Sequence, residues 1–510
     1  MDLISLLPES IVHRILSSLD SSDYNFRPPV DLVRMSVLSK TWFHLTASFP
    51  DLVFKSYDFK SQQSFIKYVG YSMSRFCHQN LTAQRLRISA IFQEPAEMDI
   101  VNRCLELLLK KGVKVLVVEI IDLPTLQEPR YRLPGILLSV TVLESLTIRG
   151  CELPSSLMVD GLKFKSLNKL ILIDVPIDDE GIRYLTPSCP FLQELKILRC
   201  YGFKTLCVYK HQNLQQVQIE YKTSVERIDI EAPNLSELTV VDIDNKGVPH
   251  MNVASCKKLT TVSYNGRWSP LPNDFLSNFP FIEKLHLVTS DNTCNNLKWS
   301  NHSLRTLVLE SDCNLEEVEF DTPILDLFIY GSAWEMVNDK CWPLLRKSAN
   351  MKSCMQCYPD SYLDALWFQK LRLFLDKKNG FKALNLYIHG RYSREVKELD
   401  ELYKMKFTEL EELNNIELPP YELQYVELEL DTYADSSAHM DIMDAVLWCC
   451  SPQHLTLRSF FPITDFEDVV KFVCKKLLQQ EDQGHTNIQI VSCPNGKTIS
   501  FIKEVVKEEA

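Results

Sequence analysis

From about residue 140 onward, apolar residues recur at the first, fourth and sixth positions of a short segment. Clear copies of this segment begin at Leu143, Leu167 and Leu192, and weaker copies begin at Leu214, Leu235, Leu259, Ile282 and Leu304. Successive copies start 21–25 residues apart. A leucine-rich core without internal repetition would not keep such a period over eight segments, so the sequence predicts a repeat array.

The spacing also predicts the structure of each repeat. Alternating apolar and polar positions indicate a short strand, because successive side chains of a strand point to opposite faces. This period, with its Leu-x-x-Leu-x-Leu strand, is typical of leucine-rich repeats, in which neighbouring coils stack their apolar positions into one core. We therefore predict an α/β fold. A short N-terminal helical segment precedes a leucine-rich-repeat solenoid with a curved parallel sheet and irregular helices on its convex side.

Three additional copies of the pattern begin at Val225, Leu315 and Ile324, about ten residues from a neighbouring copy. Their spacing predicts coils with a minimal return segment that turn near Pro233 and Pro323. We expect all the strands between residues 143 and 330 to pair in one continuous, curved parallel sheet.

The residues that alternate with the buried positions are expected to form the exposed concave face of the sheet. They are mostly polar and of mixed charge, as a solvated recognition surface would be. The candidates for contact with a substrate are Arg149, Lys169, Glu194, Lys196, Gln218, Glu237, Lys284 and His286.

The rest of the chain is predicted to extend the alternation of helices and strands. We divide the sequence into residues 1–50, a connector with the first helix–strand units at 51–135, the repeats at 136–335, and an irregular repeat-like continuation with a C-terminal cap at 336–510. A separate C-terminal domain that begins near residue 335 is the alternative.

The first fifty residues have a different pattern. Ile11, Ile15 and Leu16 recur at helical spacing behind Pro8, which suits the first turn of a helix. A second short helix is expected to begin at Ser39 as its N-cap. Helices this short are too small to bury all their apolar surface against one another, so part of that surface is expected to face a partner.

The residues of this segment resemble the F-box motif in its plant spelling. The sequence contains Leu-Pro-x-x-Ile-x-x-x-Ile-Leu from Leu7 to Leu16 and Val-Leu-Ser-Lys-x-Trp from Val37 to Trp42. An insertion around Ser21–Pro29 separates the two halves by more residues than the motif usually has. Together with the repeats, the motif makes the chain similar to the plant F-box/leucine-rich-repeat family.

The resemblance implies a non-catalytic subunit of a Skp–cullin–F-box ubiquitin ligase. The F-box would dock on the Skp-type adaptor, and through it on the cullin and RING subunits, while the repeats would hold an unknown protein substrate. By correspondence with the motif, the adaptor-facing residues are Leu7, Pro8, Ile11, Ile15, Leu16, Val37, Leu38 and Trp42. Two alternatives are a scaffold that does not lead to degradation and a receptor for a small molecule on the repeat face.

Composition excludes other classes of partner. The net charge of −12 and the scattered Lys and Arg residues argue against nucleic-acid binding, which needs a basic surface. No apolar stretch reaches the ~18 residues of a membrane span. The opening Met1-Asp2 and a short apolar run predict no signal peptide, and the 16 cysteines have no framework spacing. Free, mostly buried thiols in the nucleus or the cytoplasm, or both, are therefore expected.

Motifs for catalysis, cofactors or metals are missing from the sequence. The 14 glycines form neither a dinucleotide-binding nor a phosphate-binding loop. Cys354-x-x-Cys357 has metal or redox spacing, but no second pair accompanies it, so ordinary thiols are expected. Cys151 and Cys200 occupy the repeat position at which a small buried side chain bonds the backbone of the turn. Trp268 lies in a proline-bounded loop and is expected to pack under it or to anchor a partner.

Overall fold

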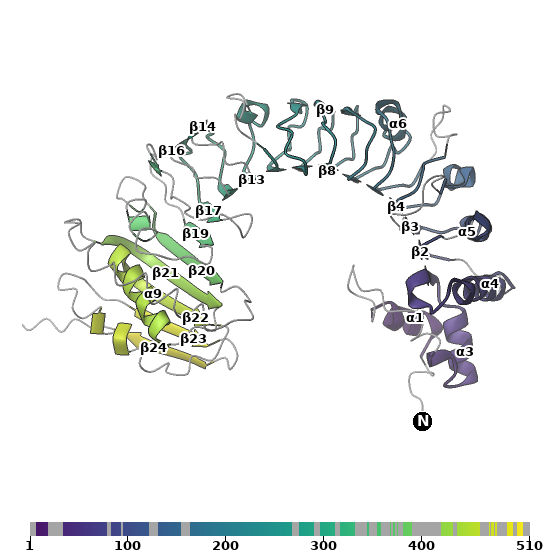
Figure 1. The fold of residues 1–510 in the computed structure, drawn as a ribbon, viewed down its shortest axis with the longest axis horizontal. Helices are drawn as coiled ribbons and strands as arrows, with labels where there is room; N and C mark the ends of the chain where they lie inside the picture. The colour runs from purple at the N-terminus through teal and green to yellow at the C-terminus, as the bar shows by residue number, and fades with distance from the viewer. Residues whose placement is uncertain are drawn as a thin grey trace, which may run out of the picture. The chain divides into compact units, whose positions relative to one another are not determined.

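A computed structural model gives the fold (Figure 1). It describes residues 7–18, 34–78, 83–92, 95–121, 131–154, 164–267, 275–289, 296–311, 317–331, 344–345, 354–358, 381–389, 420–431, 436–459, 487–492 and 497–502, with a few single residues between 368 and 476. The insertion at Ser21–Pro29 and the side chain of Trp268 lie outside the described residues. The chain forms two compact units, one of residues 1–244 and 249–259 and one of residues 245–248 and 260–510.

The N-terminal segment of the first unit contains two short helices, α1 (Glu9–Ser18) and α3 (Lys40–Ala47). They enclose a small apolar core of Val12, Leu16, Trp42, Leu45 and Phe49, against which Met35 packs. Ser39 caps α3 as predicted, since its side chain accepts a hydrogen bond of 3.2 Å from the backbone N–H of Trp42. Strand β1 follows at residue 51, so the helical segment leads directly into the sheet.

Beyond this segment, the first unit is built on a parallel sheet in which each strand pairs with the next. Its strands are β1 (Asp51–Lys55), β2 (Arg85–Ala90), β3 (Val115–Ile120), β4 (Ser145–Arg149), β5 (Lys169–Ile173), β6 (Glu194–Leu198), β8 (Gln216–Tyr221) and β10 (Glu237–Asp242). The register aligns Leu146, Leu170 and Leu195 across three strands, and each is at most 1% exposed. This confirms the α/β solenoid and the strand positions that the repeat predicted.

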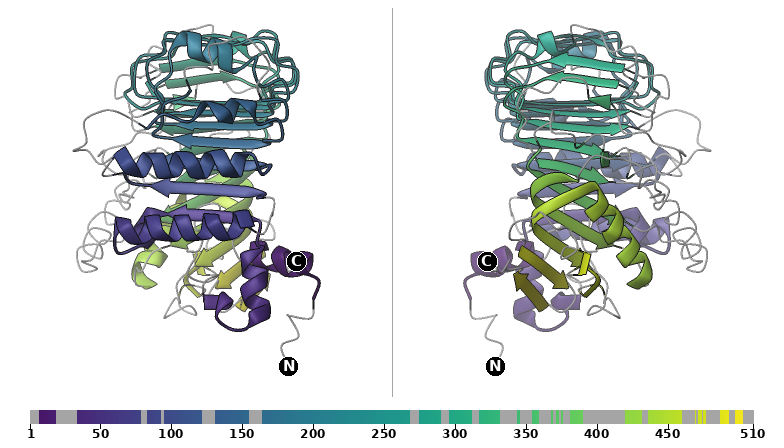
Figure 2. Two further views of the ribbon diagram at one scale, coloured as in Figure 1. Left: turned by 90° about the vertical axis from the view of Figure 1, so that its right-hand side faces the viewer. Right: turned by 90° about the vertical axis from the view of Figure 1, so that its left-hand side faces the viewer.

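Helices lie on the side of this sheet opposite its exposed face (Figures 1 and 2). They are α4 (Gln62–His78), α5 (Pro95–Leu109) and α6 (Asp179–Leu185). The buried residues of α4 and α5 recur at helical spacing and include Phe65, Val69 and Leu105. Sequence analysis missed α6, although Asp178 caps it by accepting a 2.7 Å hydrogen bond from the backbone N–H of Gly181.

In the later coils of the first unit, a strand replaces the return helix. Strands β7 (Thr205–Val208), β9 (Arg227–Ile230) and β11 (His250–Asn252) pair in parallel as a second, separate sheet. The copy that begins at Val225 belongs to this second sheet, so its prediction as an extra coil is wrong. The copy has the same sequence pattern because this return strand also alternates charged and apolar residues: Ile228 and Ile230 are buried, and Arg227 pairs with Asp229 at 2.7 Å.

The second unit continues the architecture. Its main sheet contains the parallel strands β12 (Thr261–Asn265), β13 (Lys284–Thr289), β15 (Thr306–Ser311), β17 (Leu327–Gly331), β19 (Cys354–Tyr358), β20 (Ala383–His389), β21 (Tyr421–Asp431), β22 (Cys450–Ser459) and β23 (Asn487–Ser492). Strand β24 (Lys497–Ile502) adds to β23 in the antiparallel direction. Helix α9 (Ser436–Cys449) connects β21 to β22.

A second sheet of β14 (Asn296–Ser300), β16 (Glu317–Asp321) and β18 (Leu344–Leu345) forms the return side of this unit. The copy that begins at Leu315 is therefore another return strand, and its prediction as a coil is also wrong. The copy that begins at Ile324 is a true coil, because β17 pairs directly with β15. Beyond residue 335, β19 pairs in parallel with β17, and β20 to β23 follow in the same direction. The predicted domain boundaries remain predictions.

Candidate protein-binding surfaces

The structure divides the apolar residues of the N-terminal segment into two sets. Leu16 and Trp42 are buried in its core, so they position the motif and do not lie on its surface. The other predicted contact residues are exposed: Leu7, Pro8, Ile11, Ile15, Val37 and Leu38. Val37 and Leu38 are 79% and 69% exposed, which is a large amount of apolar surface for two adjacent residues.

Polar contacts hold α1 against α3 and so fix this surface. The Nε2 atom of His13 lies 3.1 Å from the backbone oxygen of Leu45, and the imidazole packs edge-on against Phe49. Ser48, at the end of α3, donates to the carboxylate of Glu9 on α1. These contacts orient α1 so that Ile11 and Ile15 remain outside the core. We call the exposed residues Leu7, Ile11, Ile15, Val37 and Leu38 the N-terminal apolar surface.

The exposed face of the first unit's main sheet holds ion pairs between neighbouring strands. Lys169 on β5 and Lys196 on β6 both contact the carboxylate of Glu194, at 3.0 and 2.9 Å. Burial alone would raise the pKa of Glu194, but the hydrogen bonds from Lys196 and Lys169 outweigh burial and hold its pKa below the ordinary value. Three of the predicted candidates are thus brought together in one cluster.

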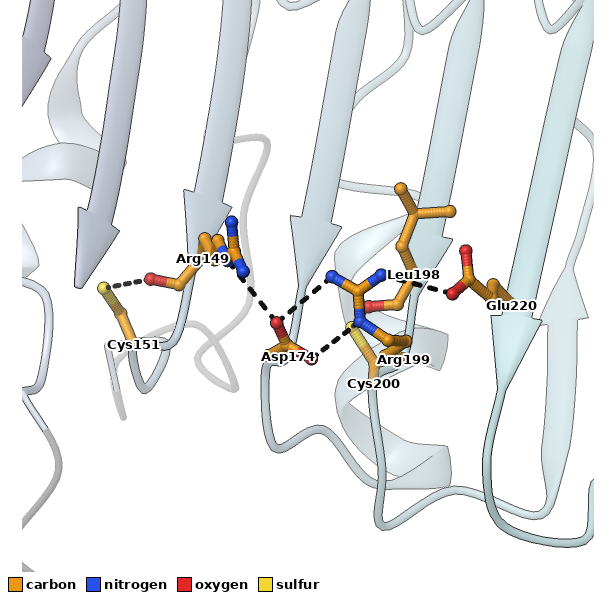
Figure 3. Close-up of polar contacts among 7 residues, drawn as sticks. All are labelled: Arg149, Cys151, Asp174, Leu198, Arg199, Cys200 and Glu220. Atoms are coloured by element: carbon orange, nitrogen blue, oxygen red, sulfur yellow. Dashed lines mark hydrogen bonds and ion pairs between the residues drawn. The ribbon is translucent and has the colours of Figure 1, made fainter. Parts of the chain in front are cut away.

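A second network follows the ends of the same strands (Figure 3). Asp174 contacts Arg149 at 3.5 Å and Arg199 at 3.1 Å, and Arg199 also contacts Glu220 at 3.2 Å. Hydrogen bonds from Arg199 to Asp174 raise the pKa of the guanidinium despite its partial burial. Sequence analysis named only Arg149 of these four residues as a candidate contact.

Two of the missed residues, Asp174 and Arg199, occupy one recurring position, the first residue after the strand. Gly150, Asp174 and Arg199 stand there in three successive coils, with φ values of 66°, 54° and 54°. Their backbone N–H groups each donate to the end of the next strand, at 3.0, 2.9 and 2.6 Å. Aligning the copies by this turn, rather than by their leucines, is the signal that could have found Asp174 and Arg199. The predicted turn bonds of Cys151 and Cys200 are confirmed, since each thiol reaches a carbonyl two residues earlier (Figure 3).

The remaining candidates lie in less connected positions. Gln218 lies beside Lys196 in the register, and Glu237 accepts a 3.2 Å hydrogen bond from the side chain of Gln216. In the second unit, Lys284 is exposed. The Nε2 atom of His286 lies 3.1 Å from Glu310, and its Nδ1 atom lies 3.5 Å from the hydroxyl of Ser263.

Two features are absent from the part of the chain that the structure describes, a metal-binding cluster and a membrane-spanning helix. No group of three or more metal-ligating side chains occurs among those residues. None of their helices has the length and apolar character to cross a membrane. The cysteines whose side chains are described are buried and free, as expected: Cys104, Cys151, Cys189, Cys200, Cys207, Cys256, Cys449 and Cys450.

Comparison with known proteins agrees with this arrangement. Residues 101–269 match the family model described as the leucine-rich repeats of the FBD-associated F-box protein At5g56370. The putative F-box/FBD/LRR-repeat protein At4g03220 of Arabidopsis thaliana is 29% identical over 249 residues, which cover 47% of this chain and 46% of that protein. F-box/LRR-repeat protein 25 of the same plant is 26% identical over 47% of this chain and 86% of its own length.

These matches are to plant F-box/leucine-rich-repeat proteins, and they support the resemblance of this chain to that family. The N-terminal segment is called the F-box from here on, because its residues resemble that motif. The chain spans about half the length of several of its relatives, including the putative F-box protein At3g58860, of which it covers 56% at 28% identity. F-box/leucine-rich-repeat proteins are generally non-catalytic.

Proposed function

We propose that this protein is the substrate-recognition subunit of a Skp–cullin–F-box ubiquitin ligase. The F-box binds the Skp-type adaptor, and the repeats hold a protein substrate near the ubiquitin-charged enzyme, which raises the effective concentration of the acceptor lysines. The proposal places the protein in the nucleus or the cytoplasm, where its buried free thiols would stay reduced.

One observation carries the proposal: the F-box completes its own core and still exposes the N-terminal apolar surface. Val12, Leu16 and Trp42 fill the core, and Ile11 and Ile15 lie outside it with 42% and 39% of their surface exposed. Full burial of such a side chain is worth about 1.5–3 kcal/mol before association costs. A few of them would supply a specific dock.

The test is a pull-down of a purified Skp-type adaptor by the full chain. Changing Ile15 to Asp should abolish adaptor capture, because it places a charge within the N-terminal apolar surface. Leu107→Asp is the matched control, since Leu107 is 49% exposed on the outer helix α5. Both variants should keep the thermal melting transition of the wild-type chain. Adaptor capture by Ile15→Asp at the wild-type level would place the dock elsewhere.

A further inference from the structure

Apolar side chains interrupt the polar face of the first unit's main sheet. Ile171 and Ile173 alternate along β5, and the register places Leu198 of β6 beside Ile173. All three are half-buried, whereas Leu170 and Leu172, on the core side of the same strand, are fully buried. We call Ile171, Ile173 and Leu198 the isoleucine patch.

Basic side chains surround this patch. The register places Arg149 beside Ile173 on one side and Lys196 beside Ile171 on the other. Lys169 precedes Ile171 on its own strand, and Arg199 directly follows Leu198. Over β4, β5, β6 and the turn residues after them, there are four basic side chains and two acidic ones, Asp174 and Glu194. Glu220 on β8 adds a third carboxylate, which contacts Arg199. The chain as a whole has a net charge of −12, so this concentration of positive charge is local.

The ion pairs show where the surplus charge lies. Arg199 is fixed between two carboxylates, those of Asp174 and Glu220 (Figure 3). Arg149 makes only a 3.5 Å contact with Asp174, and its side chain is 42% exposed. On the other side of the patch, Lys169 and Lys196 share the single carboxylate of Glu194. Arg149 and the lysine pair therefore present positive charge on both sides of the isoleucines.

The backbone at this edge is held in an unusual conformation. Asp174 and Arg199 are not glycines, yet both have a φ of 54°, in the left-handed region. Residues held in such conformations cluster at functional sites, where the surrounding structure fixes them. Here the strained turns hold Asp174 and Arg199 in the network that lies next to Arg149.

We propose that the isoleucine patch and its basic border bind an acidic segment of the protein substrate. A large apolar side chain of the segment packs on Ile171 and Ile173. A carboxylate on one side of it binds Arg149, whose planar guanidinium suits a bidentate contact, and a carboxylate on the other side binds the lysine pair. A basic segment would be repelled by the same border. This inference rests on the proposed function and specifies the chemistry of its substrate.

The experiment selects binders from a randomised peptide display library on the immobilised full-length chain. The recovered peptides should be enriched in Asp and Glu next to a large apolar residue. Their affinity for the double variant Arg149→Glu/Lys196→Glu should be at least about tenfold weaker than for wild type, because both anchoring charges are reversed. The matched control is Arg103→Glu/Lys110→Glu, an equal change of charge at exposed positions on and after the outer helix α5.

Any one of three results would overturn the inference. The library could yield basic or neutral peptides, it could yield no enriched peptide, or both double variants could bind the acidic peptides with equal affinity. Thermal melting of both double variants shows whether a loss of affinity comes from unfolding. The same samples are tested for capture of the Skp-type adaptor, which neither double variant should alter. Failure of the wild-type chain to capture the adaptor would contradict the proposed function. The peptide results concern only the chemistry of the substrate.

Discussion

At the scale of single residues, the two faces of each repeat strand have opposite tolerance to charge. Leu170 is fully buried in the stacked core, while its neighbour Lys169 points to the exposed face and pairs with Glu194. Alternation along the sequence predicted this difference correctly. It could not predict the cross-strand partners, because they depend on the register between segments about 25 residues apart.

We expect Leu170→Asp to unfold or aggregate the first unit. The substitution removes the apolar contacts of a buried leucine, worth about 2–5 kcal/mol, and adds the cost of burying an unpaired charge. Lys169→Asp is the matched change on the exposed face and should lower the free energy of unfolding by no more than about 1 kcal/mol. Urea denaturation followed by circular dichroism measures both, and similar damage from the two would contradict the register.

The turn after the strand gives a second test at the residue scale. A Cβ atom at Gly150 would lie 2.1 Å from the backbone oxygen of Ile120, and Gly150 has a φ of +66°. Gly112 has a φ of +82°, but a Cβ atom there would have no neighbour within 4 Å. Gly150→Ala should therefore lower the melting temperature well beyond Gly112→Ala, because both substitutions strain the left-handed backbone but only Gly150→Ala adds a clash. Equal shifts in differential scanning calorimetry would show that the turn relaxes freely.

At the scale of elements, the sequence predicted the strands better than the connections between them. Strands carry a repeated apolar pattern, whereas return segments vary in length and in type. The prediction places the copies at Val225 and Leu315 in the wrong sheet, because polar and apolar residues alternate with a period of two in return strands and in coil strands alike. Only the pairing of β9 with β7 and of β16 with β14 separates them.

We expect the repeats to fold without the F-box when the chain begins at Pro50. Strand β1 pairs with β2, and Pro50 accepts backbone hydrogen bonds from Gln84 and Arg85. A chain that begins later, for example at Ser61, would lack β1 and these hydrogen bonds. A chain that begins at Pro50 keeps these contacts. We expect it to retain its circular-dichroism spectrum and cooperative melting but to lose adaptor capture in a pull-down.

The test of the dock must also avoid the core of the F-box. Leu16→Asp would disrupt the cluster with Val12 and Trp42, so loss of adaptor binding in that variant would report unfolding and not lost contact. A chain from Pro50 that still captures the adaptor would show that the repeats carry the dock. A chain from Pro50 that fails to melt cooperatively would show that the repeats need the F-box as their N-terminal cap.

At the scale of the whole molecule, the fold class and the row of exposed residues follow from the repeat period, but the organisation of the face does not. Neither the isoleucine patch nor the link between Asp174 and Arg199 is visible in one repeat alone. Each depends on which residues neighbouring coils place side by side. The division of the F-box residues into core and surface was equally hidden, since Leu16 and Ile15 share one apolar stripe in the sequence.

The same contacts predict how stability depends on pH. The pKa of Glu194 is lowered, so its pairing stabilises the fold above the unfolded pKa of about 4.3 and is lost as the pH falls through the folded pKa. Burial raises the pKa of the Cys189 and Cys200 thiols to about 12. The folded protein holds these thiol protons more tightly than the unfolded chain does. The contribution of the neutral thiols to the free energy of unfolding is therefore present below the unfolded pKa of about 8.5 and is lost as the pH rises above it towards the folded pKa.

We therefore expect the melting temperature to be highest between about pH 5 and pH 8 and to fall on both sides. Glu194→Gln should reduce the loss on the acidic side and leave the alkaline side unchanged, because glutamine keeps the shape of the side chain but does not titrate. Cys200→Ser should reduce the alkaline loss, since serine has no group that ionises in that range. Thermal melts across pH measure all three chains. An acidic limb that is as steep in Glu194→Gln as in the wild type would show that other carboxylates dominate it.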